Sequence, residues 1–212
     1  MSDSITKETI RIPWNKGKII GQKPPLKRNE IWAIRIRLQL SGRIRDLALF
    51  NLAIDSKLRA CDLVRLRVGD VAQGLKVSQR ASIMQRKTKR PVQFEITEPT
   101  RIAISDLIAN SQLDSRDFLF GGSRNPSLHF STRQYGKLIK NWVAEIGLDP
   151  YTYGTHSMRR TKATLIYQRT KNLRAVQLLL GHSKLESTVR YLGIECMSQT
   201  TPFRKRPLLK HI

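Results

Sequence analysis

The stretch from Tyr135 to Ile146 reads YGKLIKNWVAEI and carries the strongest helical pattern in the chain. Its apolar residues recur at i, i+3, i+4, i+7, i+8 and i+11, which places them along one face of an α-helix. A helix with one apolar face needs a core to pack against. The pattern therefore predicts a folded, largely helical protein with Trp142 in its core.

Helical spacing also occurs on the N-terminal side of this stretch. Residues 29–40 fit a helix, although the apolar alternation over 34–40 also suits a strand. We predict a helix there, followed by helical segments at 47–54 and 59–66.

Towards the C-terminus, a loop at 147–150 precedes Thr155, which we predict to be the N-cap of a helix over 156–168. A further helix is predicted over 173–180. Gly181 suits its end, because glycine readily adopts the left-handed backbone conformation. The predicted core residues are Trp142, Ile146, Leu165, Val176 and Leu180.

Two segments have the pattern of β-strands. Residues 75–83 form a strand-like run, and apolar residues alternate with polar ones over 92–96. Between them lies the sequence QRKTKR at 85–90, which we interpret as a basic hairpin tip. The predicted fold class is mainly α with a small antiparallel β-sheet.

The charge of the chain points to a polyanionic partner. Its 212 residues include 39 Lys and Arg against 16 Asp and Glu, a formal net charge of +23. The length fits one globular domain with short appendages, and a hydrophobic share of 40% can form a core. Nucleic acid is favoured over a membrane surface, because the cations are spread along the whole chain.

Two other classes of protein are excluded by what the sequence lacks. Cys61 and Cys196 stand far apart, with no C-x-x-C pair and no nearby His, which excludes a disulfide scaffold and a zinc module. No run approaches the roughly 18 apolar residues of a membrane span. We therefore expect a soluble, cytoplasmic, nucleoid-associated protein that needs no metal.

Residues 1–28 form the first of three regions. They carry seven basic side chains and three prolines without sustained periodicity, which indicates an extended basic arm. Lys16, Lys18 and Lys23 of this arm are predicted to bind DNA, along phosphates or in a minor groove. The other regions are a folded domain and a C-terminal tail, at 29–191 and 192–212.

Two motifs in the second half carry polar side chains suited to chemistry. The H-x-x-R motif at 156–159 places both polar residues on one face near a helix N-terminus, where a phosphate can dock. A surface His and a solvated Arg would fit this motif as well. His182 follows Gly181 at a corner between two helices, and Tyr191 falls about two turns into the second helix. A partly buried core tyrosine is the alternative interpretation of Tyr191.

Taken together, these residues resemble the signature of the tyrosine recombinase, or phage integrase, family. The resemblance covers roughly residues 29–192, and the short chain is most similar to the fimbrial-switch type of recombinase. It implies the DNA breaking-rejoining fold of the family's catalytic domain, with a sheet of about three strands. The six signature positions are filled by Arg59, Lys87, His156, Arg159, His182 and Tyr191.

The resemblance also implies catalytic roles. Arg59 and Arg159 would bind the non-bridging oxygens of the scissile phosphate, where negative charge grows during the reaction, and His182 would add a further donor. Arginine suits this task because its planar group stays charged in a buried site. Tyr191 would be the nucleophile, and His156 would be the base that takes its proton.

The general acid that protonates the leaving 5′ oxygen is expected at the basic hairpin tip. We predict Lys87 in this role because the family has a Lys-Thr tip of this kind, while Arg86, Lys89 and Arg90 would bind DNA. Alternatively, all four cations only bind phosphates. Asp62 would support the arginine three residues before it by a hydrogen bond.

One departure from the family's pattern lies just before Arg59. Asp55-Ser56-Lys57 stands where Thr-Gly is usual, and the loss of this glycine is expected to alter the backbone geometry of the turn. Ser157-Met158 stands where Asp-Leu is common, and Gly193 where many members have His.

The predicted function is site-specific DNA recombination through a 3′-phosphotyrosyl intermediate, without cofactor or metal. Two alternatives stay open: a type IB topoisomerase-like nicking-closing enzyme, and a non-catalytic DNA-binding accessory factor with the same fold. The expected partners are double-stranded DNA, DNA-bending accessory proteins, and other copies of this chain in a homotetramer on two DNA sites. The tail would pack on a neighbouring subunit, and the protein without DNA is compatible with a monomer.

Overall fold

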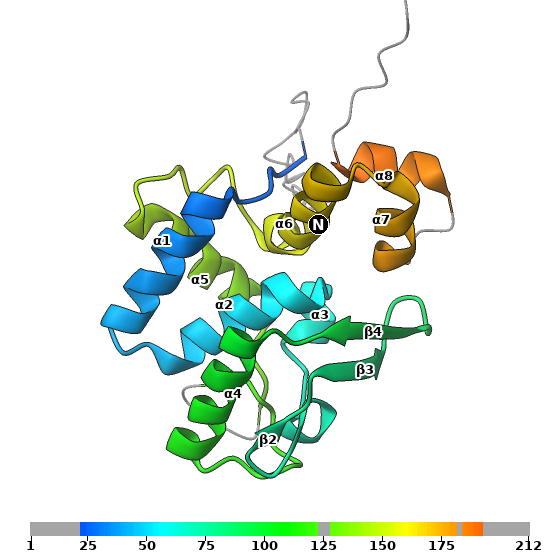
Figure 1. Cartoon of the computed structure of the whole chain (residues 1–212). Helices are drawn as coiled ribbons and strands as arrows, with labels where there is room; N and C mark the ends of the chain where they lie inside the picture. The colour runs from blue at the N-terminus through cyan, green and yellow to red at the C-terminus, as the bar shows by residue number, and fades with distance from the viewer. Residues whose placement is uncertain (1–21, 123–127, 182–183, 193–212) are drawn as a thin grey trace, which may run out of the picture.

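The computed structural model describes residues 22–122, 128–181 and 184–192. These residues form a helical domain with two small β-hairpins at one side (Figure 1). The predicted fold class is thus confirmed. None of the helices in the described ranges is long and apolar enough to cross a membrane. The helices are α1 (Arg28–Leu40), α2 (Ile44–Ser56), α3 (Ala60–Leu63), α4 (Glu98–Ser111), α5 (Thr132–Glu145), α6 (Thr155–Thr170), α7 (Leu173–Leu180) and α8 (Leu185–Leu192), with a 3-10 turn at Val68–Asp70.

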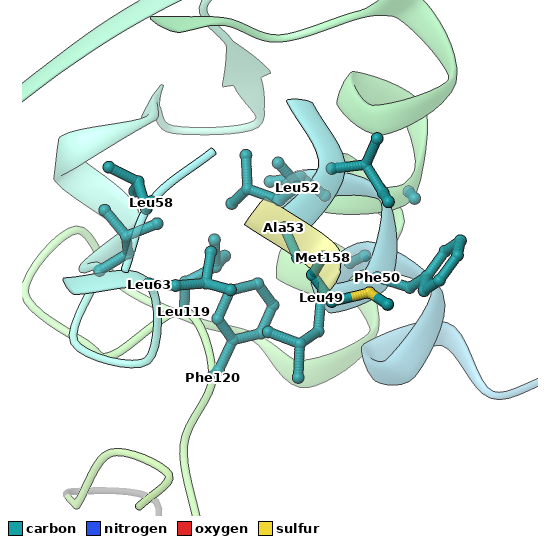
Figure 2. Packing of buried hydrophobic residues seen from close by; sticks show 14 of the residues in the cluster. Leu49, Phe50, Leu52, Ala53, Leu58, Leu63, Leu119, Phe120 and Met158 are labelled. Carbon is teal, nitrogen blue, oxygen red and sulfur yellow. The ribbon is translucent and has the colours of Figure 1, made fainter. Parts of the chain in front are cut away.

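Helix α2 lies at the centre of the main core. Its residues from Ala48 to Ser56 are all buried, and it packs against α1, α4 and α6. Figure 2 shows how residues of α2 meet Leu119, Phe120 and Met158, which come from distant parts of the chain. Because α2 is buried along most of its length and contacts several helices, it orients the elements that surround it.

Helix α5 has the amphipathic form that its sequence predicts. Tyr135, Ile139, Trp142 and Val143 are buried. The Trp142 ring packs edge-on against Phe50, with 5.6 Å between ring centroids, and its Nε1 donates to Asp46 Oδ2 at 3.2 Å. Of the predicted core residues, Trp142 is buried in the main core, and Val176 and Leu180 are buried in a second cluster. Ile146 and Leu165 are half-buried at the edge of the main core.

The strands are β1 (Ala72–Gln73), β2 (Lys76–Val77), β3 (Arg80–Met84) and β4 (Pro91–Glu95). In the described ranges they form two separate antiparallel pairs, β1 with β2 and β3 with β4, so the expectation of one sheet of about three strands was wrong. The run at 75–83 is not one strand. Strand β2 ends at Val77 and β3 begins at Arg80, with a bend between them, and Leu75 lies exposed in the turn at Gly74 (φ +59°) that precedes β2.

Two helix starts differ from the prediction. Helix α4 was missed, although Thr97 precedes it, Pro99 lies in its first turn and buried apolar residues recur along it. Helix α6 begins one residue earlier than expected, with Gly154 rather than Thr155 as its N-cap. The Gly154 backbone N–H donates to Ser157 Oγ at 3.2 Å, so the cap uses a side chain inside the helix.

Candidate active site

The predicted site residues come from four distant segments. Arg59 is the N-cap of α3, Lys87 lies between β3 and β4, and Tyr191 lies near the end of α8. His156 and Arg159 lie in the first turns of α6, which packs against α8 (Figure 1). His182 lies outside the described residues, as do Lys16 and Lys18 of the arm.

The turn before Arg59 contains Lys57. This residue ends α2 in the left-handed conformation, at φ 55° and ψ 22°, where glycine is normally preferred. The backbone thus keeps the turn expected of glycine, and the strain falls on a lysine. The Lys57 side chain is buried, and burial together with the charge of Lys162 lowers its pKa to about 8.

We predict that Lys57 makes the free energy of unfolding increase with pH in the alkaline range. Between about pH 8 and 10.5 the unfolded lysine still binds a proton that the folded one has lost, so the free energy of unfolding rises with pH by up to about 3 kcal/mol. Lys57→Met should remove most of this rise in denaturant titrations. The control is Lys171→Met, at an exposed left-handed C-cap, which should keep the rise. Equal pH dependence in parent and Lys57→Met contradicts the prediction.

Helix α2 is fixed next to this turn by a buried carboxylate. Asp55 Oδ2 accepts from the Thr97 backbone N–H at 2.9 Å and from the hydroxyls of Thr97 and Thr100, each at 2.6 Å. Lys162 Nζ donates to Oδ1 at 3.0 Å. Burial opposes the charge of Asp55, yet these contacts lower its pKa. The network ties α2 to α4 and α6, and so fixes the segment that leads to Arg59.

Arg59 and Asp62 both contact the base of the hairpin tip. Arg59 Nη1 donates to Gln85 Oε1, which also accepts from Thr88 Oγ1 at 2.8 Å. Asp62 Oδ1 accepts from the backbone N–H of Arg86 at 3.1 Å. In the part of the chain that the structure describes, Asp62 and Arg59 do not form the expected hydrogen bond with each other. Buried Gln85, which sequence reasoning missed, pairs with the arginine instead.

The hairpin tip presents its cations to solvent. Gln85 and Arg90 close the tip through a backbone hydrogen bond of 3.0 Å, and Lys89 adopts a left-handed φ of 53°. The side chains of Arg86, Lys87, Lys89 and Arg90 are all exposed. Within the described ranges, no hydrogen bond or ion pair joins Lys87 to the other site residues. The geometry therefore does not single out one of the four as the general acid.

The start of α6 contributes an imidazole and a buried guanidinium. Arg159 is buried, and its Nε makes no hydrogen bond among the described residues. Partial burial, and then the charges of Arg159 and Arg160, lower the pKa of His156, as does its place at a helix N-terminus. His156 is therefore neutral at neutral pH, the form in which it can accept a proton.

Tyr191 lies among arginines. The Arg160 guanidinium lies over its ring, 5.4 Å from the centroid, and its Oη is buried. Burial raises the pKa of the phenol to about 12, although the charges of nearby arginines act to lower it. The phenol is therefore protonated at neutral pH and needs a base to become a nucleophile. These arginines are Arg159, Arg160 and Arg59.

Arg160 is the second site residue that sequence reasoning missed. It is 5% exposed, and its Nη1 donates to the backbone oxygen of Lys23 at 2.6 Å. Periodicity gave no signal, because the residues from Ser157 to Thr161 are all buried and α6 shows no single apolar face there. Lys23 itself lies against the domain, with its Nζ donating to the Tyr151 backbone oxygen.

No three His, Cys, Asp or Glu side chains in the described ranges gather closely enough to hold a metal ion. The groups that surround the phenol are guanidinium donors. Such donors bind the oxygens of a phosphate, and around a tyrosine they suit the attack of its oxygen on phosphorus.

Comparison with known proteins agrees with this chemistry. The family model described as the Phage integrase family matches residues 26–195, so the chain belongs to that family. It is 30% identical over 156 residues to the probable integrase/recombinase YoeC of Bacillus subtilis, covering 74% of this chain and 81% of that protein. It is also 30% identical to the tyrosine recombinase XerD of Xanthomonas campestris pv. campestris, covering 70% of this chain and 47% of XerD.

Solved structures have the same fold. The crystal structure of XerA recombinase matches with a TM-score of 0.69 at 20% identity, over 89% of this chain and 66% of that one. The XerH site-specific recombinase bound to difH substrate matches with a TM-score of 0.64 at 18% identity, over 81% and 51%. The described domain thus has the fold of these recombinases, and the chain spans about half the length of XerD and XerH.

Proposed function

We propose that this protein is a site-specific recombinase that cleaves and rejoins DNA through a 3′-phosphotyrosyl bond to Tyr191. One observation carries the proposal: the Arg160 guanidinium of α6 lies over the ring of a buried phenol of α8, and the charges of Arg159 and Arg59 act on the same phenol. Among the described residues no carboxylate forms an ion pair with these three arginines, and Arg59 and Arg160 donate to uncharged oxygens of Gln85 and of the Lys23 backbone. A buried charge without an ion pair is costly, and a phosphate at this place would supply a counter-charge.

Cleavage then proceeds as an in-line displacement at phosphorus. Tyr191 Oη loses its proton to His156 and forms the new P–O bond, while the bond from phosphorus to the 5′ oxygen of the next nucleotide breaks. Lys87 gives a proton to that oxygen, which leaves as a hydroxyl. Rejoining is the reverse, with a 5′ hydroxyl of another strand attacking the phosphotyrosine.

The growing negative charge on the phosphate is met by fixed donors. Arg59 and Arg159 bind the non-bridging oxygens, and His182 is proposed as a further donor. The Nε of Arg159, which has no protein partner in the described ranges, is available to such an oxygen. Asp62 is held by a hydrogen bond from the hairpin backbone, and its negative charge favours the charged form of Arg159. We assign it this supporting role.

Binding of double-stranded DNA is proposed for the exposed cations. Arg86, Lys89 and Arg90 at the hairpin tip would bind backbone phosphates. The role proposed for the basic arm at 1–28 falls to Lys16 and Lys18, since the Lys23 ammonium is already bound to a backbone oxygen. The exchange reaction would use a homotetramer on two DNA sites, formed from monomers, with residues 192–212 packing on a neighbour. We further propose that the protein recruits DNA-bending proteins and acts at the nucleoid. Its reaction is proposed to be of the fimbrial-switch type.

Trapping the covalent intermediate tests this function without knowledge of the target site. Nicked genomic fragments are incubated with the protein in EDTA, adducts are captured, and both the attached DNA end and the modified residue are identified. We expect adducts at Tyr191 on a 3′ phosphate at few genomic positions. Absence of any adduct favours an accessory DNA-binding factor. Adducts whose rejoining needs no second site favour a topoisomerase-like enzyme.

A further inference from the structure

Arg160 connects the N-terminal segment of the domain to the proposed nucleophile. Its Nη1 donates to the Lys23 backbone oxygen at 2.6 Å, and its guanidinium carbon lies 5.4 Å from the centroid of the Tyr191 ring. The side chain is 5% exposed. One buried guanidinium therefore holds two segments that are far apart in the sequence.

The segment that accepts this hydrogen bond is itself fixed in place. Lys23 precedes Pro24 and Pro25, and a residue before proline is restricted to extended conformations. Leu26 is buried, and its backbone N–H donates to Thr161 Oγ1 at 3.0 Å. The hydroxyl of Thr161, next to Arg160, thus binds the same segment.

Arg159 and Arg160 have separate tasks because neighbouring residues on a helix point about 100° apart. The Arg159 Nε makes no bond to the described residues, whereas Arg160 is bound to a backbone oxygen and covers the face of the phenol ring. A planar guanidinium can stack on a ring and donate in its own plane at the same time, which an ammonium group cannot do.

We propose that Arg160 is a positioning residue that holds the Tyr191 ring for attack and couples its position to residues 22–26. The proposal rests on Tyr191 being the nucleophile. Docking of residues 22–26 on the domain then stabilises the position of α8 in which Tyr191 can attack the phosphate.

Fluorine NMR of the full-length protein labelled with fluorotyrosine tests the contact without DNA. The chain has five tyrosines, and the Tyr191 signal is identified by its loss in Tyr191→Phe. We expect Arg160→Gln to shift this signal at neutral pH, because a cation is removed from the face of the ring. Arg160→Lys should restore the parent signal in part. The exposed Arg169→Gln on the same helix should leave the signal unchanged, and an unmoved Tyr191 signal in Arg160→Gln overturns the proposal.

Coupling to the N-terminal segment has its own test. The double change Pro24→Gly and Pro25→Gly loosens the acceptor without removing the Lys23 carbonyl, and should move the Tyr191 signal in the same direction. In the Arg160→Gln background it should add no further shift, because the link is already broken. Fully additive shifts overturn the coupling.

The effect on cleavage is measured as the rate of adduct formation at saturating DNA. We expect Arg160→Gln to slow it about tenfold, with unchanged DNA affinity, and Arg160→Lys to recover part of the loss. An unchanged rate overturns the positioning role. If the parent protein forms no adduct, the recombinase proposal fails, while the NMR result still decides whether Arg160 holds the ring.

Discussion

We expect Tyr191→Phe to lower the yield of the covalent adduct more than about 10³-fold, while DNA affinity stays at the parent level. The substitution removes only the oxygen that attacks phosphorus. The ring remains, so its contact with Arg160 and the packing of α8 on α6 are kept. Adduct yield and DNA affinity are measured on the fragments recovered from the trapping experiment.

Tyr151→Phe is the matched control. Tyr151 is 74% exposed and lies in the loop before α6, whereas the hydroxyl of the proposed nucleophile Tyr191 is buried. This variant should form adducts at the parent rate. Adduct formation that persists in Tyr191→Phe would assign the nucleophile to another residue and end the mechanism proposed above.

We expect Arg159→Ala to slow adduct formation by about 10² to 10³-fold, the cost of losing one fixed donor to a developing oxyanion. Its unfolding temperature should change little or increase, because the parent carries a buried guanidinium whose Nε lacks a partner in the described ranges. Arg159→Lys recovers only part of the rate, since one ammonium cannot replace the planar fork of donors.

The control for this pair is Arg169→Ala, an exposed arginine of the same helix. It should keep the parent rate at saturating DNA and show only the small loss of affinity expected of one fewer surface cation. A parent-like rate in Arg159→Ala would remove this residue from the site. A fall in unfolding temperature that matches the loss of rate would show a structural role instead.

Much of the fold was accessible from local patterns. The apolar face of α5, the helical spacing of apolar residues in α1, α2 and α7, and a capping signal before α6 predicted helices that the structure contains. Two predictions of secondary structure failed for local reasons. The run at 75–83 has strand-forming residues but contains a bend that separates β2 from β3. Helix α4 follows β4 so closely that its capping signal was not recognised.

The order and type of the chemical groups were readable in the chain itself. An arginine in a short helix, a basic hairpin tip, H-x-x-R and a late tyrosine identify the family, because each group must have a particular chemistry and a particular place along the sequence. Because each requirement concerns a residue type at a particular position along the chain, it can be detected in the sequence.

Which of these groups meet depended on packing between distant segments. Gln85 binds Arg59, and Arg160 joins the Lys23 backbone to Tyr191, yet neither Gln85 nor Arg160 fills a signature position of the family. A backbone oxygen has no sequence signature, and a contact across 137 positions obeys no spacing rule. Such contacts arise only when burial of the core brings α6, α8 and the segment before α1 together, because the apolar surfaces fix their positions and the polar groups must pair where they then lie.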